Sequence, residues 1–451
     1  MLQKGSLIID SEPFVHVLMQ KQRDKRCDEC FQESLDPGKK LLRCSSCKFV
    51  RYCNTNCQRK AWQLHKSECR CLKRVSPRFP TDAARLFYLL CIRWKNGDHI
   101  SVKEDGRSFS QFMSHEEEIK QSTEKIEEFQ KLCHTMLAYV GGDSEALPSL
   151  TDQMSIYGKM VVNSFSICDQ EMQAIGSGVY LKASRLDHRC CMNAVVTFRG
   201  TKLQLRLLED FPKEKAANLD EVYISYTDQL QPLHERQKAL QQQYFFTCQC
   251  DMCLDQNLNN SMLALKCPSV SCKEPVNLIA EDLVCPSCGP VQSDHVDTGA
   301  ACVQHWQDTV DMLDKAVSDQ DWVQILCQCK SWLNSWEPVL HEDNIYLRRV
   351  QDYAADACIQ LGKLDQAVKY LSNLQTYRKY YHKYHPNVGL QLFKLGKLEL
   401  YLNNLNNAYK HLQEASDILD LTHGKDSPIA QDLQYQKVQC AEELNSISAV
   451  N

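Results

Sequence analysis

Apolar residues recur at helical spacing through residues 72–155 of this chain. Thr81 is placed to cap a helix whose apolar face carries Ala83, Leu86, Phe87, Leu90 and Trp94. Ser114 and Glu117 form a capping-box pattern ahead of a second series, Ile119, Ile126, Phe129, Cys133, Met136 and Val140. The pattern predicts helices whose apolar faces are buried in a core.

Short apolar and alternating runs before and after this stretch predict strands. The first two are Leu7–Ile9 and Phe14–Leu18, separated by a turn at Ser11-Glu12-Pro13. The later ones follow residue 156: Gly176–Tyr180, Ala194–Phe198, the alternating Leu203, Leu205 and Leu207, and Val222–Tyr226. Gly176-Ser177-Gly178 is a weak nucleotide-binding signal, and a hairpin turn is the better explanation. Helical and strand segments in separate runs indicate an α+β fold.

Residues 300–445 are helical and repetitive. Leu361-Gly-Lys-Leu-Asp-Gln-Ala aligns with Leu402-Asn-Asn-Leu-Asn-Asn-Ala at an offset of 41, so that Ala367 corresponds to Ala408. Lys383-x2-Pro386 is echoed by Lys425-x2-Pro428, at an offset of 42. This self-similarity predicts stacked helical hairpins resembling tetratricopeptide repeats, which either bind peptides or pack on a neighbouring domain.

Between residues 27 and 69, eight potential zinc ligands occur in four close pairs. They are Cys27 and Cys30, Cys44 and Cys47, Cys53 and Cys57, and His65 and Cys69. Tetrahedral zinc takes four nitrogen or sulfur ligands, so the pairs fit two ions. Cys57, His65 and Cys69 share one face of an expected helix over 57–69. A disulfide framework is the alternative, but the histidine completes the ligand count and no secretory signal precedes the segment.

The spacing closely resembles the MYND zinc finger. In that family the pairs interleave, so the resemblance implies one ion held by Cys27, Cys30, Cys53 and Cys57, and another held by Cys44, Cys47, His65 and Cys69.

Two further cysteine groups lie later in the chain. Cys248, Cys250 and Cys253 are one ligand short of a zinc site, so a distant residue must supply the fourth ligand. Cys267, Cys272, Cys285 and Cys288 have the spacing of a self-sufficient zinc ribbon or knuckle. We therefore expect three or four zinc ions in all.

The charge is unevenly distributed. The whole chain has a formal net charge of −5, whereas residues 21–78 carry sixteen Lys or Arg against six Asp or Glu. A basic finger suggests a peptide or acidic partner, and a solvated lysine-rich surface is an equal alternative. Nucleic acid is a further candidate through phosphate contacts, although no base-reading motif is present. No apolar run is long enough to span a membrane, and we expect a soluble protein of the cytoplasm and nucleus.

Several segments together resemble the SET and MYND domain family of protein-lysine methyltransferases. They are Asn163-Ser164-Phe165, Leu186-Asp187-His188-Arg189-Cys190, Tyr223-Ile224-Ser225-Tyr226 and Tyr244-Phe245-Phe246-Thr247-Cys248-Gln249-Cys250. The similarity covers most of the chain. It implies a split SET β-fold with an inserted MYND finger, a post-SET zinc site and a helical repeat domain. The expected domains are a SET segment (1–26), the finger (27–69), a helical insertion (70–155), the SET core (156–228), the post-SET region (229–255), a zinc knuckle (256–292) and the repeats (293–451).

The resemblance also implies the site. Cys190 would join Cys248, Cys250 and Cys253 around the third zinc, and Tyr226 would orient the lysine amine and the methyl group. Phe165 and Tyr244 would line the substrate channel. Asn163, Ser184, Asp187, His188 and Phe246 would contact S-adenosylmethionine. The implied substrate is a lysine of a histone or non-histone protein, whose neutral amine must reach the methyl through a narrow apolar channel.

The sequence departs from the family pattern in two places. Asp187 and Arg189 stand where the family has asparagine and serine, and the family's glycine-rich first strand, which holds the cofactor, has no match in the printed sequence. A protein-lysine methyltransferase is the leading function. The alternative is a catalytically impaired, zinc-built interaction scaffold.

Overall fold

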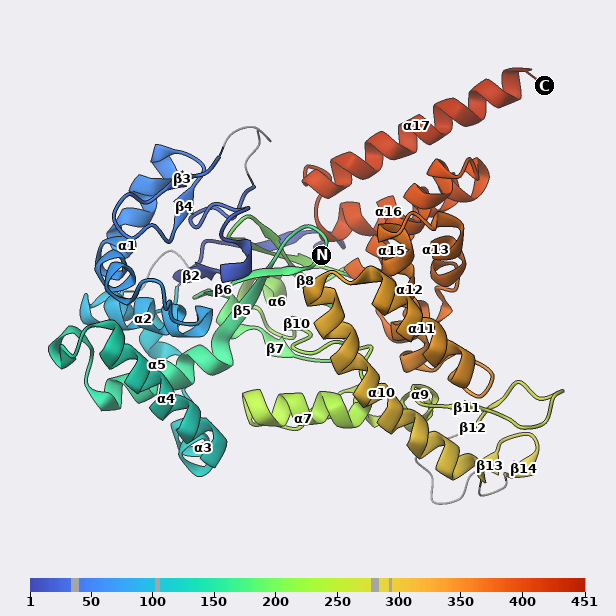
Figure 1. Ribbon diagram of the computed structural model, residues 1–451, viewed down its shortest axis with the longest axis horizontal. Coiled ribbons are helices and arrows are strands. Elements are labelled where there is room, and N and C mark those ends of the chain that lie inside the picture. The colour runs from blue at the N-terminus through green and yellow to red at the C-terminus, as the bar shows by residue number, and fades with distance from the viewer. Residues whose placement is uncertain (34–39, 102–105, 277–283, 292–293, 451) are drawn as a thin grey trace. The chain divides into compact units, whose positions relative to one another are not determined.

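The computed structural model describes residues 1–33, 40–101, 106–276, 284–291 and 294–450, and it forms two compact units (Figure 1). The N-terminal unit comprises Met1–Asp187, Ala194–Tyr223 and Gln241–Phe246. The C-terminal unit comprises His188–Asn193, Ile224–Leu240 and Thr247–Asn451.

Two three-stranded antiparallel sheets form the β part of the N-terminal unit. One has the order β1 (Leu7–Ser11), β9 (Lys202–Leu207), β8 (Ala194–Arg199), and the other β2 (Val15–Leu18), β6 (Ala174–Val179), β5 (Ser164–Cys168). Ile9 pairs with Leu205, so strands almost 200 residues apart in sequence are neighbours. Leu203, Leu205 and Leu207 are all fully buried, which confirms the period-two pattern expected for a half-buried strand.

The Gly176-Ser177-Gly178 segment is not a hairpin turn, contrary to the sequence-based expectation. It lies inside β6, where Gly176 pairs with Leu18 on one side and Ile167 on the other. A Cβ atom at Gly176 would lie 2.3 Å from the Phe31 ring and 2.6 Å from the Val17 carbonyl oxygen. The glycine is required because a ring and a backbone approach the strand too closely for any side chain.

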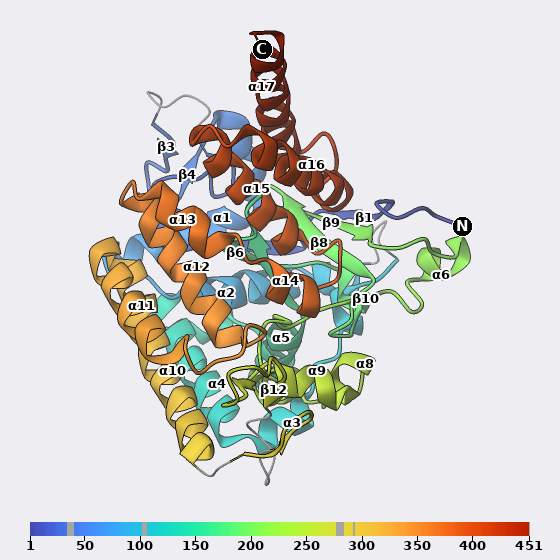
Figure 2. The ribbon, with the colours of Figure 1, turned by 90° about the vertical axis from the view of Figure 1, so that its right-hand side faces the viewer.

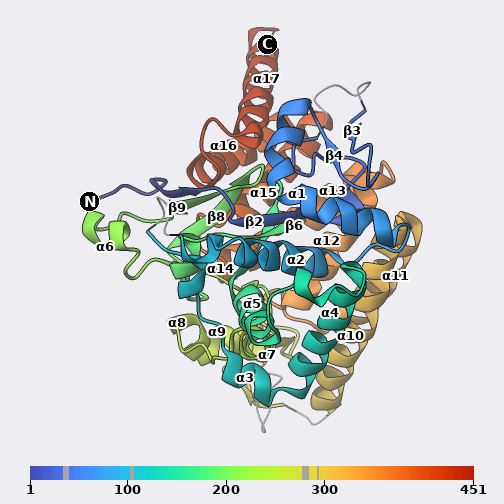
Figure 3. The same cartoon turned by 90° about the vertical axis from the view of Figure 1, so that its left-hand side faces the viewer.

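Helices cover the rest of this unit. They are α1 (Thr55–Val75), α2 (Asp82–Lys95), α3 (Glu116–Gln121), α4 (Thr123–Tyr139), α5 (Leu150–Asn163) and α6 (Lys213–Asn218). Figure 3 shows α2, α4 and α5 packed beside one another. The Thr81 cap is confirmed, because its hydroxyl accepts from the Ala84 N–H at 3.2 Å.

The capping box expected at Ser114 and Glu117 is wrong. His115 precedes α3 in the left-handed region, at φ 49°. Ser114 Oγ instead donates to the Glu116 carboxylate at 3.2 Å. The long helix that follows begins separately, and its cap is the Ser122 hydroxyl, which accepts from the Lys125 N–H.

Short strands and helices occupy the cysteine-rich regions. They are β3 (Leu42–Arg43), β4 (Arg51–Tyr52), β11 (Leu265–Lys266), β12 (Pro275–Val276), β13 (Val284–Cys285), β14 (Gly289–Pro290), α8 (Asp251–Leu254) and α9 (Gln256–Ser261). Three further elements cross the boundary between the units: β7 (Asp187–His188), β10 (Tyr223–Ile224) and α7 (Leu233–Tyr244). The strand expected over Val222–Tyr226 is therefore reduced to Tyr223–Ile224.

The C-terminal unit continues as an array of helices. These are α10 (Asp294–Asp319), α11 (Trp322–Trp336), α12 (Ile345–Gln360), α13 (Leu364–Leu371), α14 (Gln375–Tyr380), α15 (Pro386–Tyr401), α16 (Leu405–Thr422) and α17 (Pro428–Val450). Successive helices pack side by side, as α11, α12 and α13 do in Figure 2. Ala367 and Ala408 are both fully buried in α13 and α16, as their matched repeat positions predict. Among the residues that the structure describes, no helix combines the length and apolar character that a bilayer-spanning segment needs.

Candidate metal centres and ligand pocket

The finger, residues 27–69, brings its eight candidate ligands into two groups. One contains Cys27, Cys30, Cys53 and Cys57, and the other Cys44, Cys47, His65 and Cys69. Within each group all ligand atoms lie within 4.8 Å of one another. The grouping interleaves the pairs, as the resemblance implied. Asn54 caps α1 by accepting from the Cys57 N–H at 2.9 Å, which fixes the helix that carries Cys57, His65 and Cys69.

The distances within these groups match the geometry of a zinc site. Zinc with sulfur ligands at about 2.3 Å in a tetrahedron separates neighbouring sulfurs by about 3.8 Å. Cys30 and Cys53 Sγ are 3.8 Å apart, and so are Cys44 and Cys69 Sγ. The adjacent Cys30 thiol also lowers the pKa of the Cys27 thiol to about 5, and a thiolate is the form that binds metal. The donor set therefore fits two zinc ions.

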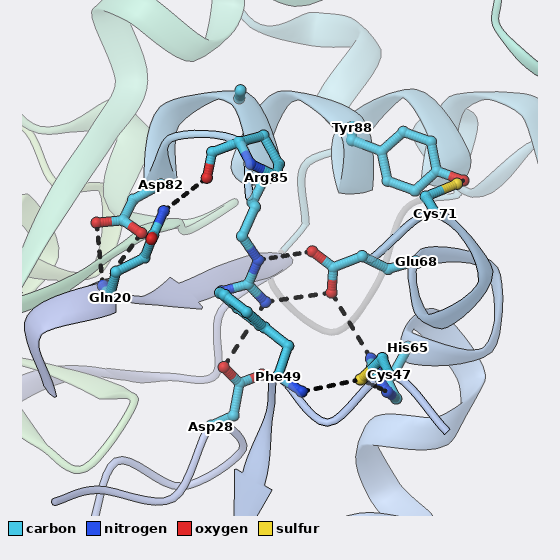
Figure 4. A network of polar contacts seen from close by, with 12 residues as sticks. Gln20, Asp28, Cys47, Phe49, His65, Glu68, Cys71, Asp82, Arg85 and Tyr88 are labelled. Atoms are coloured by element: carbon cyan, nitrogen blue, oxygen red, sulfur yellow. Dashed lines mark hydrogen bonds and ion pairs between the residues drawn. The ribbon is translucent and has the colours of Figure 1, made fainter. Parts of the chain in front are cut away.

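A buried ion network connects the second finger group to α2 (Figure 4). His65 Nδ1 lies 3.7 Å from the Glu68 carboxylate, and Arg85 of α2 contacts the same carboxylate through Nε at 2.7 Å and Nη2 at 3.1 Å. Arg85 also lies 3.6 Å from Asp28, which neighbours Cys27. Glu68 is 2 % exposed and Arg85 1 %, so each charge depends on the other for compensation. This network orients the zinc-facing imidazole and attaches the finger to the helices.

The third group lies in the C-terminal unit. Cys190, Cys248, Cys250 and Cys253 are all buried, with their sulfurs within 4.8 Å of one another, and Cys190 and Cys253 Sγ are 3.5 Å apart. The structure thus brings Cys190 to the three clustered cysteines, as the resemblance implied. Hydrogen bonds from the Cys190 and Cys191 thiols lower the pKa of the Cys250 thiol. Arg189, which stands where the family has serine, pairs with Asp251 at 3.4 Å.

His188 connects this third group to Tyr226. The Tyr226 backbone N–H donates to His188 Nδ1 at 2.9 Å, and His188 Nε2 lies 3.4 Å from Cys190 Sγ. Because Nδ1 accepts, the neutral ring carries its proton on Nε2 and donates it to the sulfur. Burial lowers the pKa of His188 to about 4 and favours this neutral ring. A ligand cysteine, an imidazole and the backbone of Tyr226 therefore form one continuous chain.

The fourth group also lies in the C-terminal unit. Cys267, Cys272, Cys285 and Cys288 come together within 4.8 Å, carried by the turns around β11 to β14. Cys272 and Cys285 Sγ are 3.6 Å apart. The four residues suffice for one ion, as their spacing predicts.

Two of the expected cofactor residues line a cavity of about 490 Å³ in the N-terminal unit. They are Ser184 and Asp187, and the other side chains of the lining are Arg107, Gln111, Met113 and Arg185. Asp187 is exposed at the pocket, while Ser184 Oγ accepts from Arg107 Nη1 at 3.0 Å and donates to the Leu181 carbonyl at 2.8 Å. The pocket offers hydrogen-bonding groups and charges of both signs. That donor set fits a zwitterionic amino acid group such as the end of S-adenosylmethionine.

Helix α5 holds the pocket segment 107–114 in place. Lys159 Nζ donates to the carbonyls of Ser110 and Phe112 at 3.1 and 2.7 Å, and Asn163 Nδ2 donates to the Met113 carbonyl at 3.3 Å. Gly158 permits the approach, since a Cβ there would lie 1.9 Å from the Ser114 carbonyl oxygen. Asn163, which is expected to contact the cofactor, supports the pocket wall through this hydrogen bond. Sequence reasoning missed Lys159 and Arg107, because neither lies in a recognisable motif.

The remaining expected residues are half-buried. Phe165 lies on β5 with its ring edge-on to Tyr180, at a centroid distance of 5.8 Å. Tyr244 ends α7, and burial raises the pKa of its hydroxyl. Phe246 follows after Phe245, whose backbone is left-handed at φ 62°. Phe165, Tyr244 and Phe246 belong to the N-terminal unit with Asn163, Ser184 and Asp187, whereas His188 and Tyr226 belong to the C-terminal unit.

We expect four zinc ions per chain, because fifteen cysteines and His65 form four complete groups. Elemental analysis of the purified protein measures the stoichiometry. Cys285→Ser should remove one ion and leave three, whereas serine at Cys327, which is exposed and outside the groups, should leave four. A wild-type content of two or fewer would contradict the two groups outside the finger.

Glu68→Gln should destabilise the finger, because it leaves the buried Arg85 without its closest carboxylate. The expected loss is about 3 kcal/mol of unfolding free energy, together with faster transfer of zinc to a chelator. The matched control is Glu33→Gln, which breaks the pair with Arg26 at a carboxylate 62 % exposed and should cost at most about 1 kcal/mol. Equal thermal stability and zinc release in the two variants would show that the network does not support the finger.

Comparison with known proteins agrees with this architecture. Residues 27–69 match the family model of the MYND finger. The chain is 32% identical over 445 residues to histone-lysine N-methyltransferase SMYD3 of Homo sapiens, covering 97% of this chain and 93% of the relative. It is 27% identical over 429 residues to N-lysine methyltransferase SMYD2-A of Xenopus laevis, covering 94% and 91%. With its finger, cysteine groups, mixed α/β unit and helical C-terminal region, the chain belongs to the SET and MYND domain family of protein-lysine methyltransferases.

Proposed function

We propose that this protein transfers a methyl group from S-adenosylmethionine to the side-chain amine of a lysine in a histone or non-histone protein. The observation that carries the proposal is the similarity over 97% of the chain to a histone-lysine N-methyltransferase. The cavity at Ser184 and Asp187 supports it, because its donor set fits the cofactor. S-adenosylmethionine, when bound, supplies the electrophilic methyl group.

In this proposal the chain's own residues bind, orient and exclude water. Asn163, Ser184, Asp187, His188 and Phe246 hold the cofactor, and Asp187 accepts from its ammonium group. Phe165 and Tyr244 line an apolar channel that favours the neutral, nucleophilic lysine amine by desolvation. The Tyr226 hydroxyl orients that amine toward the methyl. The His188 contacts to the Tyr226 N–H and to Cys190 support this role, since they fix the tyrosine backbone to a proposed zinc ligand.

The finger is proposed to bind an acidic peptide along α1. Arg59, Lys66, Arg70 and Lys73 recur along one exposed side of that helix. Among the described residues, none of the four makes an ion pair with a carboxylate. Trp62, 46 % exposed, adds an apolar contact beside them. Four exposed cations that pair with no carboxylate among the described residues favour an anionic ligand. We propose that the protein works in both nucleus and cytoplasm, where such substrates and partners occur.

Tyr226→Phe should reduce methyl transfer at least about 100-fold while leaving the fold intact, because only the orienting hydroxyl is removed. Transfer of labelled methyl to histone and non-histone substrates measures the activity, and calorimetry with S-adenosylmethionine measures binding. Cofactor affinity should stay within about threefold of wild type.

Asp187→Asn distinguishes an enzyme from an impaired scaffold. In a working enzyme Asp187 accepts from the cofactor's ammonium, so removing its charge should weaken cofactor binding. If Asp187 repels the cofactor's carboxylate and impairs the site, the same change should strengthen binding and raise activity. No binding and no transfer in wild type, Tyr226→Phe and Asp187→Asn alike would favour the scaffold alternative.

Charge reversal on α1 should abolish acidic-peptide binding. We expect Lys66→Glu with Arg70→Glu to weaken binding of a polyglutamate peptide at least about tenfold. The affinity of the wild-type protein for the peptide should fall steeply as the salt concentration rises from about 50 to about 200 mM. Lys213→Glu with Lys238→Glu, which makes the same change of charge elsewhere on the exposed surface, is the control. If binding does not depend on salt, or if the two double variants lose the same affinity, the basic side chains of α1 are only a solvated surface. If the protein binds a DNA oligonucleotide more tightly than the peptide, the partner of the finger is a nucleic acid and not an acidic peptide.

A further inference from the structure

Arg107 carries a positive charge that the described residues do not neutralise. Its guanidinium donates to two uncharged acceptors, Ser184 Oγ at 3.0 Å and the Gln111 carbonyl at 3.1 Å. Among the described residues, no carboxylate forms an ion pair with it. Burial, and secondarily the nearby charge of Arg185, lower the pKa of Arg107. A half-buried cation of this kind is costly unless an anion accompanies it.

The second guanidinium of the pocket is exposed, and its hydrogen-bond acceptor is also uncharged. Arg185 donates through Nη2 to the Asn218 carbonyl at 2.8 Å, again an uncharged acceptor. Arg107 and Arg185 line the cavity together with Asp187. Among the described residues of its lining, the pocket therefore combines two cations and one exposed carboxylate, and so offers partners to both an anionic and a cationic group of a ligand.

Arg107 is held in position by its surroundings. Its guanidinium carbon lies 4.9 Å from the centroid of the Phe112 ring, and the Phe112 carbonyl accepts from the buried Lys159 at 2.7 Å. At the end of this segment, the Ser114 carbonyl approaches Gly158 closely and so lies against α5. A guanidinium fixed in this way loses little freedom when it binds an anion, so its position is pre-organised.

We propose that Arg107, assisted by Arg185, binds the carboxylate of the cofactor's amino acid end, while Asp187 binds its ammonium group. The inference rests on the proposed function and makes Arg107 a specificity residue for the cofactor. The guanidinium can offer two parallel N–H donors to a carboxylate, which gives Arg107 the anionic partner that it lacks among the described residues. Asp187 then meets the positive group of the same ligand, and the two arginines compensate for its repulsion of the ligand carboxylate.

Ligands with and without the amino acid end should respond differently to a change at Arg107. S-adenosylmethionine and S-adenosylhomocysteine carry the amino acid end, whereas 5′-methylthioadenosine lacks it. Arg107 should therefore contribute to the affinity of the first two compounds and contribute nothing to that of the third.

Calorimetry with these three compounds on the full chain tests the inference. Arg107→Ala should weaken S-adenosylmethionine and S-adenosylhomocysteine about 10- to 100-fold, the range for a charged hydrogen bond, and should leave 5′-methylthioadenosine within about twofold. Arg107→Lys should recover part of the loss, because it restores the charge without the two-donor geometry. Arg78→Ala, at an exposed arginine outside the pocket, is the matched control and should bind all three like wild type. Thermal unfolding of each variant verifies that the segment remains folded.

The two possible failures are distinguishable. If wild type binds S-adenosylmethionine but Arg107→Ala weakens all three compounds equally, or none, Arg107 has no role in recognising the carboxylate, and the proposed function stands. If wild type binds none of the three, both the proposed function and this inference are overturned.

Discussion

The rest of this structure depends on grouping sulfur atoms closely enough to share a cation. In the part of the finger that the structure describes, the only strands and α-helix are the two-residue β3 and β4 and the long polar α1, so the finger has little apolar surface to bury on its own. Thiolates within 4.8 Å of one another repel unless a metal lies between them. The metal sites therefore hold segments that packing alone would not order, and they set where α1 lies.

The influence of the metal groups extends past their ligands by two different routes. In the N-terminal unit, a buried ion network of His65, Glu68 and Arg85 connects a finger ligand group to α2. In the C-terminal unit, Cys190, His188 and the Tyr226 backbone are joined by hydrogen bonds. In both cases an imidazole connects a sulfur group to a structural element, and its second nitrogen fixes the ring orientation. Loss of zinc would thus affect stability in the first unit and the placement of Tyr226 in the second.

The pocket changes how the substitution at position 187 is understood. Taken alone, an aspartate in place of asparagine adds a negative charge where a ligand carboxylate would bind. The cavity also contains Arg185, two residues before Asp187, and Arg107 from a segment distant in sequence, and both supply the opposite charge. The effect of one residue on a ligand is thus set by the sum of charges around the pocket. Helix α5 contributes indirectly, because contacts of its residues Gly158, Lys159 and Asn163 hold the segment that carries Arg107.

The sequence by itself determined what depends on local spacing. The four ligand groups follow from cysteine intervals and one family resemblance, the Thr81 cap from a hydroxyl ahead of an apolar series, and the paired repeats from the match of Ala367 with Ala408. The tertiary structure decided what depends on long-range approach. Gly176 lies inside a strand, where the Phe31 ring leaves no room for a side chain. The capping box expected at Ser114 is replaced by a left-handed backbone at His115. Arg107 comes to the pocket from a segment 80 residues away in sequence from Asp187, and Gly158 admits the Ser114 end of that segment. Local spacing records which residues can share a metal ion or a helix face, but it holds no information about which distant backbone will come within van der Waals contact.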